Sequence, residues 1–170
     1  MNHSRANMIS FKMMSFVHEF LYGLFRDPNK ALNAAGLKPG QNVLEVGCGP
    51  GFFTIPAARI VGAAGDILSL DVNPVAVDHV RQKIAAAGIM NAKAMVANAA
   101  RTNLPDLSID LTFLFGLAHP IGDMDKMWIE LHRILKQEGT LSIEGRLRPL
   151  PELFQFVLRK GRISQFRKVG

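Results

Sequence analysis

Apolar and polar positions follow two periods along the chain, one typical of helices and one typical of strands. Apolar residues recur at helical spacing over residues 9–24, and a short helix over residues 29–35 ends at Gly36. Further on, short apolar runs that predict strands alternate with stretches that predict helices. We expect strands at residues 43–46, 66–71, 93–97, 109–115, 140–144 and 162–169, and helices at residues 52–61, 74–88, 124–138 and 152–160.

Residues with known end preferences mark two of these helices. Asn73 is a typical N-cap residue and Pro74 suits the first helical turn. Asp123 is the predicted N-cap of the helix that follows it, and Gly139 is expected to end that helix.

The order of the elements predicts an α/β fold. Strands that alternate with helices over about 130 residues form a doubly wound, mostly parallel, Rossmann-like sheet with helices on both faces. We divide the chain into an N-terminal helical lid or extension, residues 1–36, and a main domain, residues 37–170. Because doubly wound sheets bind ligands at the carboxyl ends of their strands, functional residues are expected in the loops after strands.

Length and composition indicate one globular domain. The chain has 170 residues, of which 48% are hydrophobic and 20% charged. Lys12, His18 and Glu19 interrupt the apolar N-terminal stretch, so neither a signal peptide nor an integral membrane segment is predicted. A single cysteine, Cys48, allows no intramolecular disulfide, and no histidine or cysteine cluster predicts a metal site. These features favour a cytoplasmic protein.

The net charge of +6 is confined to one end of the chain. Basic and acidic residues balance through residue 144, and the whole excess follows Glu144. A basic protein usually raises nucleic acid as a partner. Here the predicted ligand-binding part is electrically balanced, so we expect no nucleic-acid partner.

A glycine cluster follows the first strand, where a ligand is expected. Gly47, Gly49 and Gly51 allow a tight turn and a close approach of the backbone to a ligand. The third glycine of a dinucleotide-binding loop is missing, since Phe52 stands in its place. Asp71 lies 20 residues after Gly51, at the end of the second strand, where a carboxylate can bind ribose hydroxyls. The pattern indicates a nucleoside ligand without a pyrophosphate, and S-adenosylmethionine is the commonest cofactor of that kind.

Residues 43–51 resemble motif I of the class I S-adenosylmethionine-dependent methyltransferases almost residue for residue. Residues 108–111 and 131–139 resemble two further conserved stretches of that family, and Asp71 matches its ribose-binding acid. The most similar branch is the small-molecule one that includes the ubiquinone and menaquinone biosynthesis methyltransferases. The resemblance implies S-adenosyl-L-methionine as cofactor and a small, possibly apolar, methyl acceptor.

The resemblance also implies a set of cofactor-binding residues. Gly47 and Gly49 would lie against the methionine moiety with Glu45 near its ammonium group, and Val72 would cover one face of the adenine. Asn98 stands where the family usually has Asp, so its hydrogen bond to adenine loses charge assistance, a difference of about 1 kcal/mol. The full expected set is Glu45, Gly47, Cys48, Gly49, Gly51, Asp71, Val72, Asn98, Ala99 and Phe115.

Two residues are candidates for the acceptor side. His119 follows the fourth strand, where it would act as a general base or simply bond to backbone, and Tyr22 would reach the cofactor if the N-terminal helix is a lid. Methyl transfer needs mainly alignment, so no dedicated catalytic residue is identified.

The rival interpretation is a non-catalytic, degenerate methyltransferase domain that acts as a binding module or partner subunit. Asn98 is one reason for it. The other is that the family sheet has seven strands, whereas only six are predicted here, so the last strand is expected to be missing. An open sheet edge of this kind would favour a homo-oligomer in which another subunit completes the sheet.

Overall fold

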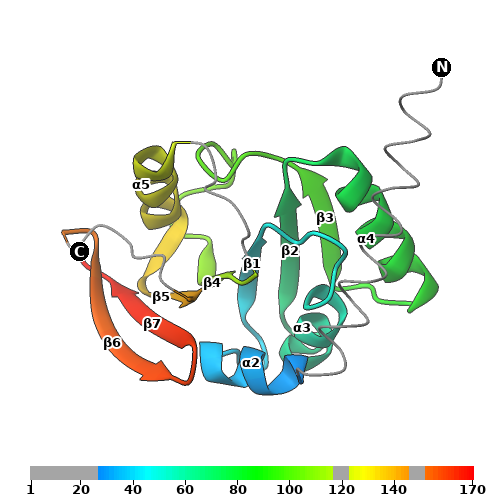
Figure 1. The fold of residues 1–170 in the computed structure, drawn as a ribbon, viewed down its shortest axis with the longest axis horizontal. Helices are drawn as coiled ribbons and strands as arrows, with labels where there is room; N and C mark the ends of the chain where they lie inside the picture. The colour runs from blue at the N-terminus through cyan, green and yellow to red at the C-terminus, as the bar shows by residue number, and fades with distance from the viewer. Residues whose placement is uncertain (1–26, 117–122, 146–151) are drawn as a thin grey trace.

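The computed structural model describes residues 27–116, 123–145 and 152–170. Helices and strands alternate through most of this part of the chain (Figure 1). In chain order the elements are α2 (Pro28–Ala35), β1 (Asn42–Val46), α3 (Thr54–Val61), β2 (Asp66–Asp71), α4 (Pro74–Ala86), β3 (Ala92–Val96), β4 (Ile109–Leu114), α5 (Met124–Ile134), β5 (Leu135–Glu144), β6 (Phe154–Lys160) and β7 (Ile163–Lys168).

All the strands of the described part belong to one seven-stranded sheet in the order β3-β2-β1-β4-β5-β7-β6. The five strands from β3 to β5 are parallel, and β7 is antiparallel to both of its neighbours. This confirms the predicted doubly wound, mostly parallel sheet. Strand order reverses between β1 and β4, so their carboxyl ends flank the crevice where such sheets bind ligands.

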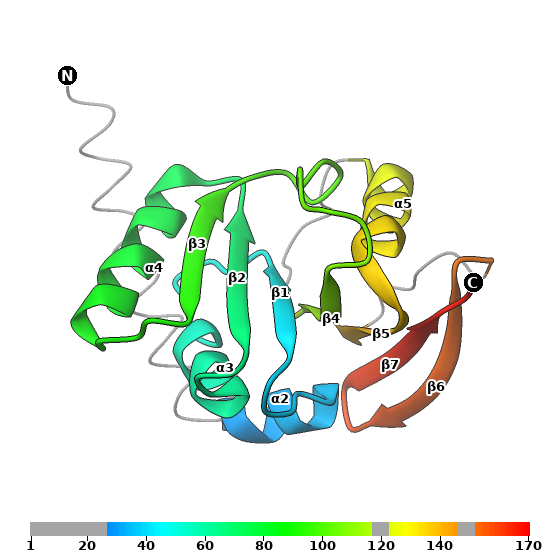
Figure 2. The same cartoon turned by 180° about the vertical axis from the view of Figure 1, so that it is seen from behind.

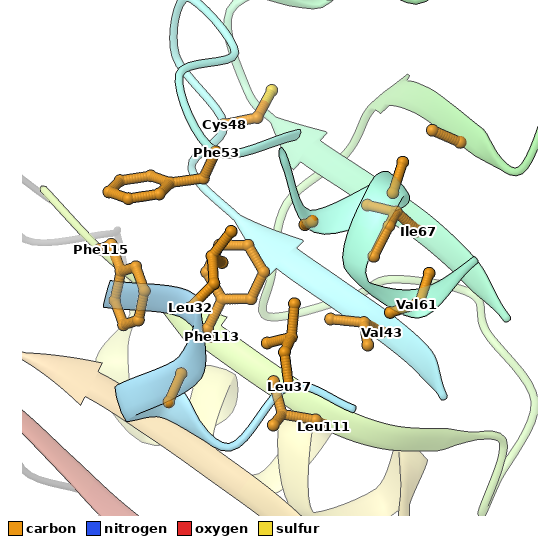
Figure 3. Close-up of a cluster of buried hydrophobic side chains, with 14 of the residues drawn as sticks. Leu32, Leu37, Val43, Cys48, Phe53, Val61, Ile67, Leu111, Phe113 and Phe115 are labelled. Carbon is orange, nitrogen blue, oxygen red and sulfur yellow. The ribbon is translucent and has the colours of Figure 1, made fainter. Parts of the chain in front are cut away.

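Helices cover both faces of the sheet, and each face has its own core (Figures 1 and 2). Side chains of β1 alternate between the two cores. Val43 packs on the side of α2, α3 and α4, among residues that include Leu32 and Phe113 (Figure 3). Leu44 packs on the other side, with Leu131 of α5. These cores fix the strand ends that carry the site.

In the segment 152–160, which was predicted to be a helix, Phe154–Lys160 instead form strand β6. β6 and β7 make an antiparallel hairpin in which Phe154 is buried and pairs with Lys168. The spacing of apolar residues in this segment is compatible with a helix and with a strand, and the pairing with β7 makes it a strand. The hairpin supplies the seventh strand, so the expectation of a missing last strand is wrong. The reason for expecting another subunit to complete the sheet disappears with it.

The helix predicted to end at Gly139 ends earlier, at Ile134, and β5 begins at Leu135. Leu135 adopts an extended backbone and pairs with Ile109, and its side chain is completely buried. The register then shifts before Thr140. A Cβ at Gly139 would lie 2.8 Å from the carbonyl oxygen of Lys136, so glycine is required by this irregular stretch of strand.

Helix α2 is packed firmly onto the sheet. Ser142 Oγ of β5 donates to the carbonyl of Ala35 at 2.6 Å, and Gln165 Nε2 of β7 donates to that of Ala34 at 2.7 Å. The helix predicted at residues 9–24 lies outside the described residues. Among the helices that the structure does describe, none is long and apolar enough to cross a membrane.

Candidate cofactor site

The glycine loop joins β1 to α3 at the carboxyl edge of the sheet. Gly47, Gly49 and Gly51 all have positive φ angles, of 73°, 49° and 79°. The backbone N–H groups of Gly47 and Cys48 donate to the carbonyl of Leu70 at 2.8 and 2.9 Å, which ties the loop to the end of β2. Apart from Gly49 itself and its two chain neighbours, no atom of the described residues lies within 4 Å of the place where a Cβ on Gly49 would stand, so this part of the structure leaves the backbone open to a ligand.

A lysine that no sequence pattern indicated holds the other side of this loop. Lys83 Nζ, on α4, donates to the carbonyls of Pro50 and Gly51 at 3.1 and 3.3 Å. A Cβ on Gly51 would lie 2.9 Å from Val80 Cγ2, so the loop packs closely on α4. Lys83 is 32 residues from the loop, and no local pattern links the two.

Asp71, at the end of β2, connects directly to the glycine loop. Its Oδ2 accepts from the backbone N–H of Gly49 at 2.9 Å, and its Oδ1 accepts from that of Asn73 at 2.9 Å. The structure therefore brings together the two features that the sequence singled out separately. Each carboxylate oxygen keeps a second lone pair for a donor such as a hydroxyl.

Glu45 lies beneath the loop and is only 2% exposed. Its Oε2 accepts from the hydroxyls of Thr54 and Ser69, both at 2.6 Å. Burial raises the pKa of Glu45 to about 7, although these two hydrogen bonds and the charge of Lys83 lower it in part. Neither hydroxyl partner was predicted from the sequence. The available signal was Ser69, a polar residue within a buried strand, which pairs with Glu45 in the sheet register.

Three expected adenine-side residues follow β2 and β3. Val72 is 62% exposed. Asn98 is exposed, and its Oδ1 accepts from the backbone N–H of Ala100 at 2.8 Å. Ala99, next to it, is buried. All three lie in loops at the carboxyl edge of the sheet.

The remaining expected residues divide into buried and undescribed ones. Phe115 is buried, with its ring centroid 5.2 Å from that of Phe53 and 4.9 Å from that of Phe113 (Figure 3). Cys48 is also buried, which raises the pKa of its thiol and keeps it protonated. Tyr22 and His119 lie outside the described residues.

Comparison with known proteins identifies the family. The model of the methyltransferase domain family matches residues 37–155. The ubiquinone/menaquinone biosynthesis C-methyltransferase UbiE of Marinomonas sp. (strain MWYL1) is 32% identical over 128 residues, which are 74% of this chain and 51% of that protein. UbiE of Psychromonas ingrahamii is 34% identical over 123 residues, or 71% of this chain and 49% of that protein. The chain thus spans about half the length of these curated relatives.

Solved structures share the fold. A SAM-dependent methyltransferase from Aquifex aeolicus superposes with a TM-score of 0.74 at 24% identity, covering 84% of this chain and 90% of that one. A TehB-like methyltransferase from Corynebacterium glutamicum has a TM-score of 0.72 at 16% identity, covering 95% and 99%. The comparisons confirm the resemblance seen in motif I, and with it S-adenosylmethionine as the cofactor. The chain belongs to the methyltransferase domain family and has the class I, S-adenosylmethionine-dependent form of its fold.

Proposed function

We propose that this protein transfers a methyl group from S-adenosylmethionine to a small acceptor molecule. The observation that carries the proposal is the hydrogen bond between the N–H of Gly49 and Asp71 Oδ2, at 2.9 Å. It places an open glycine backbone and a carboxylate with spare lone pairs side by side at the switch point of the sheet. When bound, S-adenosylmethionine supplies an activated methyl group.

The residues present fit such a cofactor. Asp71 would bind the ribose hydroxyls, the open backbone at Gly49 would lie against the methionine part, and Val72 would cover the adenine. Glu45 would act from below the loop, because its Oε1 makes no hydrogen bond within the described residues, whereas Oε2 is held by Ser69 and Thr54. The remaining expected residues, Phe115 and Cys48 among them, support this site from the core.

The acceptor we propose is a small molecule and not a nucleic acid. The chain is electrically balanced through residue 144, and the loop after β4 has no Asn-Pro-Pro or Asp-Pro-Pro sequence of the kind carried by DNA amino-methylating enzymes. The relatives are C-methyltransferases of ubiquinone and menaquinone biosynthesis, so precursors from that biosynthesis are the first acceptors to test. His119 and Tyr22 remain the candidates for contact with the acceptor.

The non-catalytic alternative has lost one of its two supports, because the described sheet has seven strands. Its other support was Asn98. That side chain still carries a carbonyl acceptor, which has one lone pair free after its bond to Ala100.

A charge-neutral substitution at the end of β2 tests the cofactor site. Asp71→Asn should weaken S-adenosylmethionine binding by about 2 to 3 kcal/mol, roughly 30- to 150-fold, because the amide keeps only one of the two acceptor oxygens and that oxygen is uncharged. Asp66→Asn is the matched control, since Asp66 is exposed at the other end of the same strand. Titration calorimetry measures both. Equal affinity in wild type and Asp71→Asn would remove Asp71 from the site.

A further inference from the structure

None of the residues proposed to bind the cofactor carries the surplus positive charge of the chain. Four of its side chains, those of Arg159, Lys160, Arg162 and Arg167, are exposed on the β6–β7 hairpin. We call residues 154–168 the basic hairpin. Arg162 and Arg167 lie 3.6 and 3.5 Å from a carboxylate each. Within the described residues, Arg159 and Lys160 lie near no carboxylate, so their charge is not neutralised locally.

Exposed apolar side chains adjoin this charge on the edge strand. Phe156 is 56% exposed and Val157 is 43% exposed, and both precede Arg159 by a few residues on β6. The ring of Phe156 packs against that of Phe166 at 5.7 Å, yet more than half of the residue faces solvent. An aromatic and an aliphatic side chain next to lysine and arginine form the combination that lies at lipid headgroups, where rings enter the interface and cations meet anionic lipid.

The turn of the basic hairpin lies at the same edge of the sheet as the cofactor loop. Ile163, just after the turn, pairs with Glu144 at the carboxyl end of β5, and the N–H of Gly145 donates to the carbonyl of Arg162 at 3.0 Å. Glu144 Oε2 in turn accepts from the N–H of Gly116, just beyond β4, at 3.2 Å. β4 is the neighbour of β1, which leads into the glycine loop. A flat surface that meets this turn therefore also faces the edge where ligands bind.

The hairpin is poorly built for pairing with a second copy of the chain. Its ladder with β7 shifts register between Phe156 and Leu158, and such an irregularity disturbs the outer edge of β6. Two copies joined along β6 would also bring two sets of arginine and lysine side chains together. An anionic surface would instead attract these arginine and lysine side chains.

We propose that the basic hairpin binds anionic lipid surfaces, with the carboxyl edge of the sheet toward the lipid. The binding itself depends only on the hairpin. We infer that this lipid binding lets the protein take up an apolar methyl acceptor from the lipid, and that part of the proposal rests on the proposed methyltransferase function.

Vesicle sedimentation with the full chain tests the proposal. Wild type should bind vesicles with about 30% phosphatidylglycerol, should not bind pure phosphatidylcholine vesicles, and should be released between about 0.1 and 0.5 M salt. Arg159→Gln with Lys160→Gln should bind about 25-fold more weakly, at roughly fivefold for each charge. Lys38→Gln with Lys93→Gln is the matched control, because both lysines are exposed near the amino ends of β1 and β3. Phe156→Ser should also weaken vesicle binding, and lowering the salt concentration should not restore it.

Each other outcome overturns the proposal. These are no vesicle binding, equal binding to both vesicle types, equal loss in the control pair, binding to a duplex oligonucleotide in place of vesicles, and a dimer that Phe156→Ser dissociates. Calorimetry with S-adenosylmethionine on the same samples separates the two proposals. If wild type binds vesicles but not S-adenosylmethionine, only the methyltransferase function is refuted. If the hairpin variants bind S-adenosylmethionine as wild type does, they are folded.

Discussion

The buried carboxyl group of Glu45 should make the stability of this protein fall as pH rises. Its pKa is about 7 in the folded state against 4.5 for an ordinary glutamate, and burial is the main cause. Between these two values the folded state holds a proton that the unfolded state has released. Titration of Glu45 therefore does not change the free energy of unfolding below about pH 4.5. Between about pH 4.5 and pH 7 it lowers that free energy progressively.

The substitution Glu45→Gln removes this titration while keeping the shape of the side chain. A shift from 4.5 to about 7 corresponds to a cost of about 3 kcal/mol above neutral pH, as an upper value. The Gln carbonyl can still accept from the hydroxyls of Thr54 and Ser69, which both bond to one oxygen of Glu45. At pH 8 the variant should be more stable than wild type by up to about 3 kcal/mol, and its Tm should rise by up to about 10 °C.

Urea denaturation followed by circular dichroism at pH 5 and pH 8 measures the effect. The difference in free energy of unfolding between Glu45→Gln and wild type should grow as pH rises. The control Glu152→Gln, at an exposed position, should have the same free energy of unfolding as wild type at both pH values. S-adenosylmethionine should bind the variant more weakly, because a carboxylate near the cofactor's ammonium group is lost. A constant gap at the two pH values, or a wild type that is more stable at pH 8, would refute this explanation of Glu45.

Three further substitutions test the packing around the site by urea denaturation. Gly51→Ala should destabilise by about 2 to 3 kcal/mol, because its φ is 79° and the new Cβ would lie 2.9 Å from Val80 Cγ2. Thr112→Val should stabilise by about 1 kcal/mol, because the buried Thr112 hydroxyl has no hydrogen-bond partner in the described part. Glu130→Gln should destabilise by about 2 kcal/mol at pH 7 and by less near pH 2, because Arg133 holds the pKa of Glu130 near 2 and its wild-type contribution is lost as pH falls from 4.5.

The sequence predicted the parallel sheet and the cofactor loop because both depend on local patterns. Short apolar runs between helices indicated β1 to β4, and the Asn73 cap forms as expected, with its Oδ1 accepting from the N–H of Val75. The pairing of Asp71 with the loop agrees with the spacing in the chain, because Asp71 ends the strand next to β1.

What the sequence did not predict depends on contacts between distant segments. Phe154–Lys160 form a strand because β7 pairs with them, and no local period distinguishes that outcome from a helix. The same holds for Lys83, whose bonds to the glycine loop span 32 and 33 residues. Glu45 was expected from motif I, but its burial and raised pKa follow from three elements that meet beneath the loop.

Titration calorimetry of the full chain with three ligands tests whether this protein is an S-adenosylmethionine-dependent methyltransferase. We predict binding of S-adenosylmethionine and S-adenosylhomocysteine, and no binding of NAD, because the glycine loop has Phe52 where a dinucleotide loop needs glycine. Binding of NAD alone, or of none of the three, would refute the methyltransferase function.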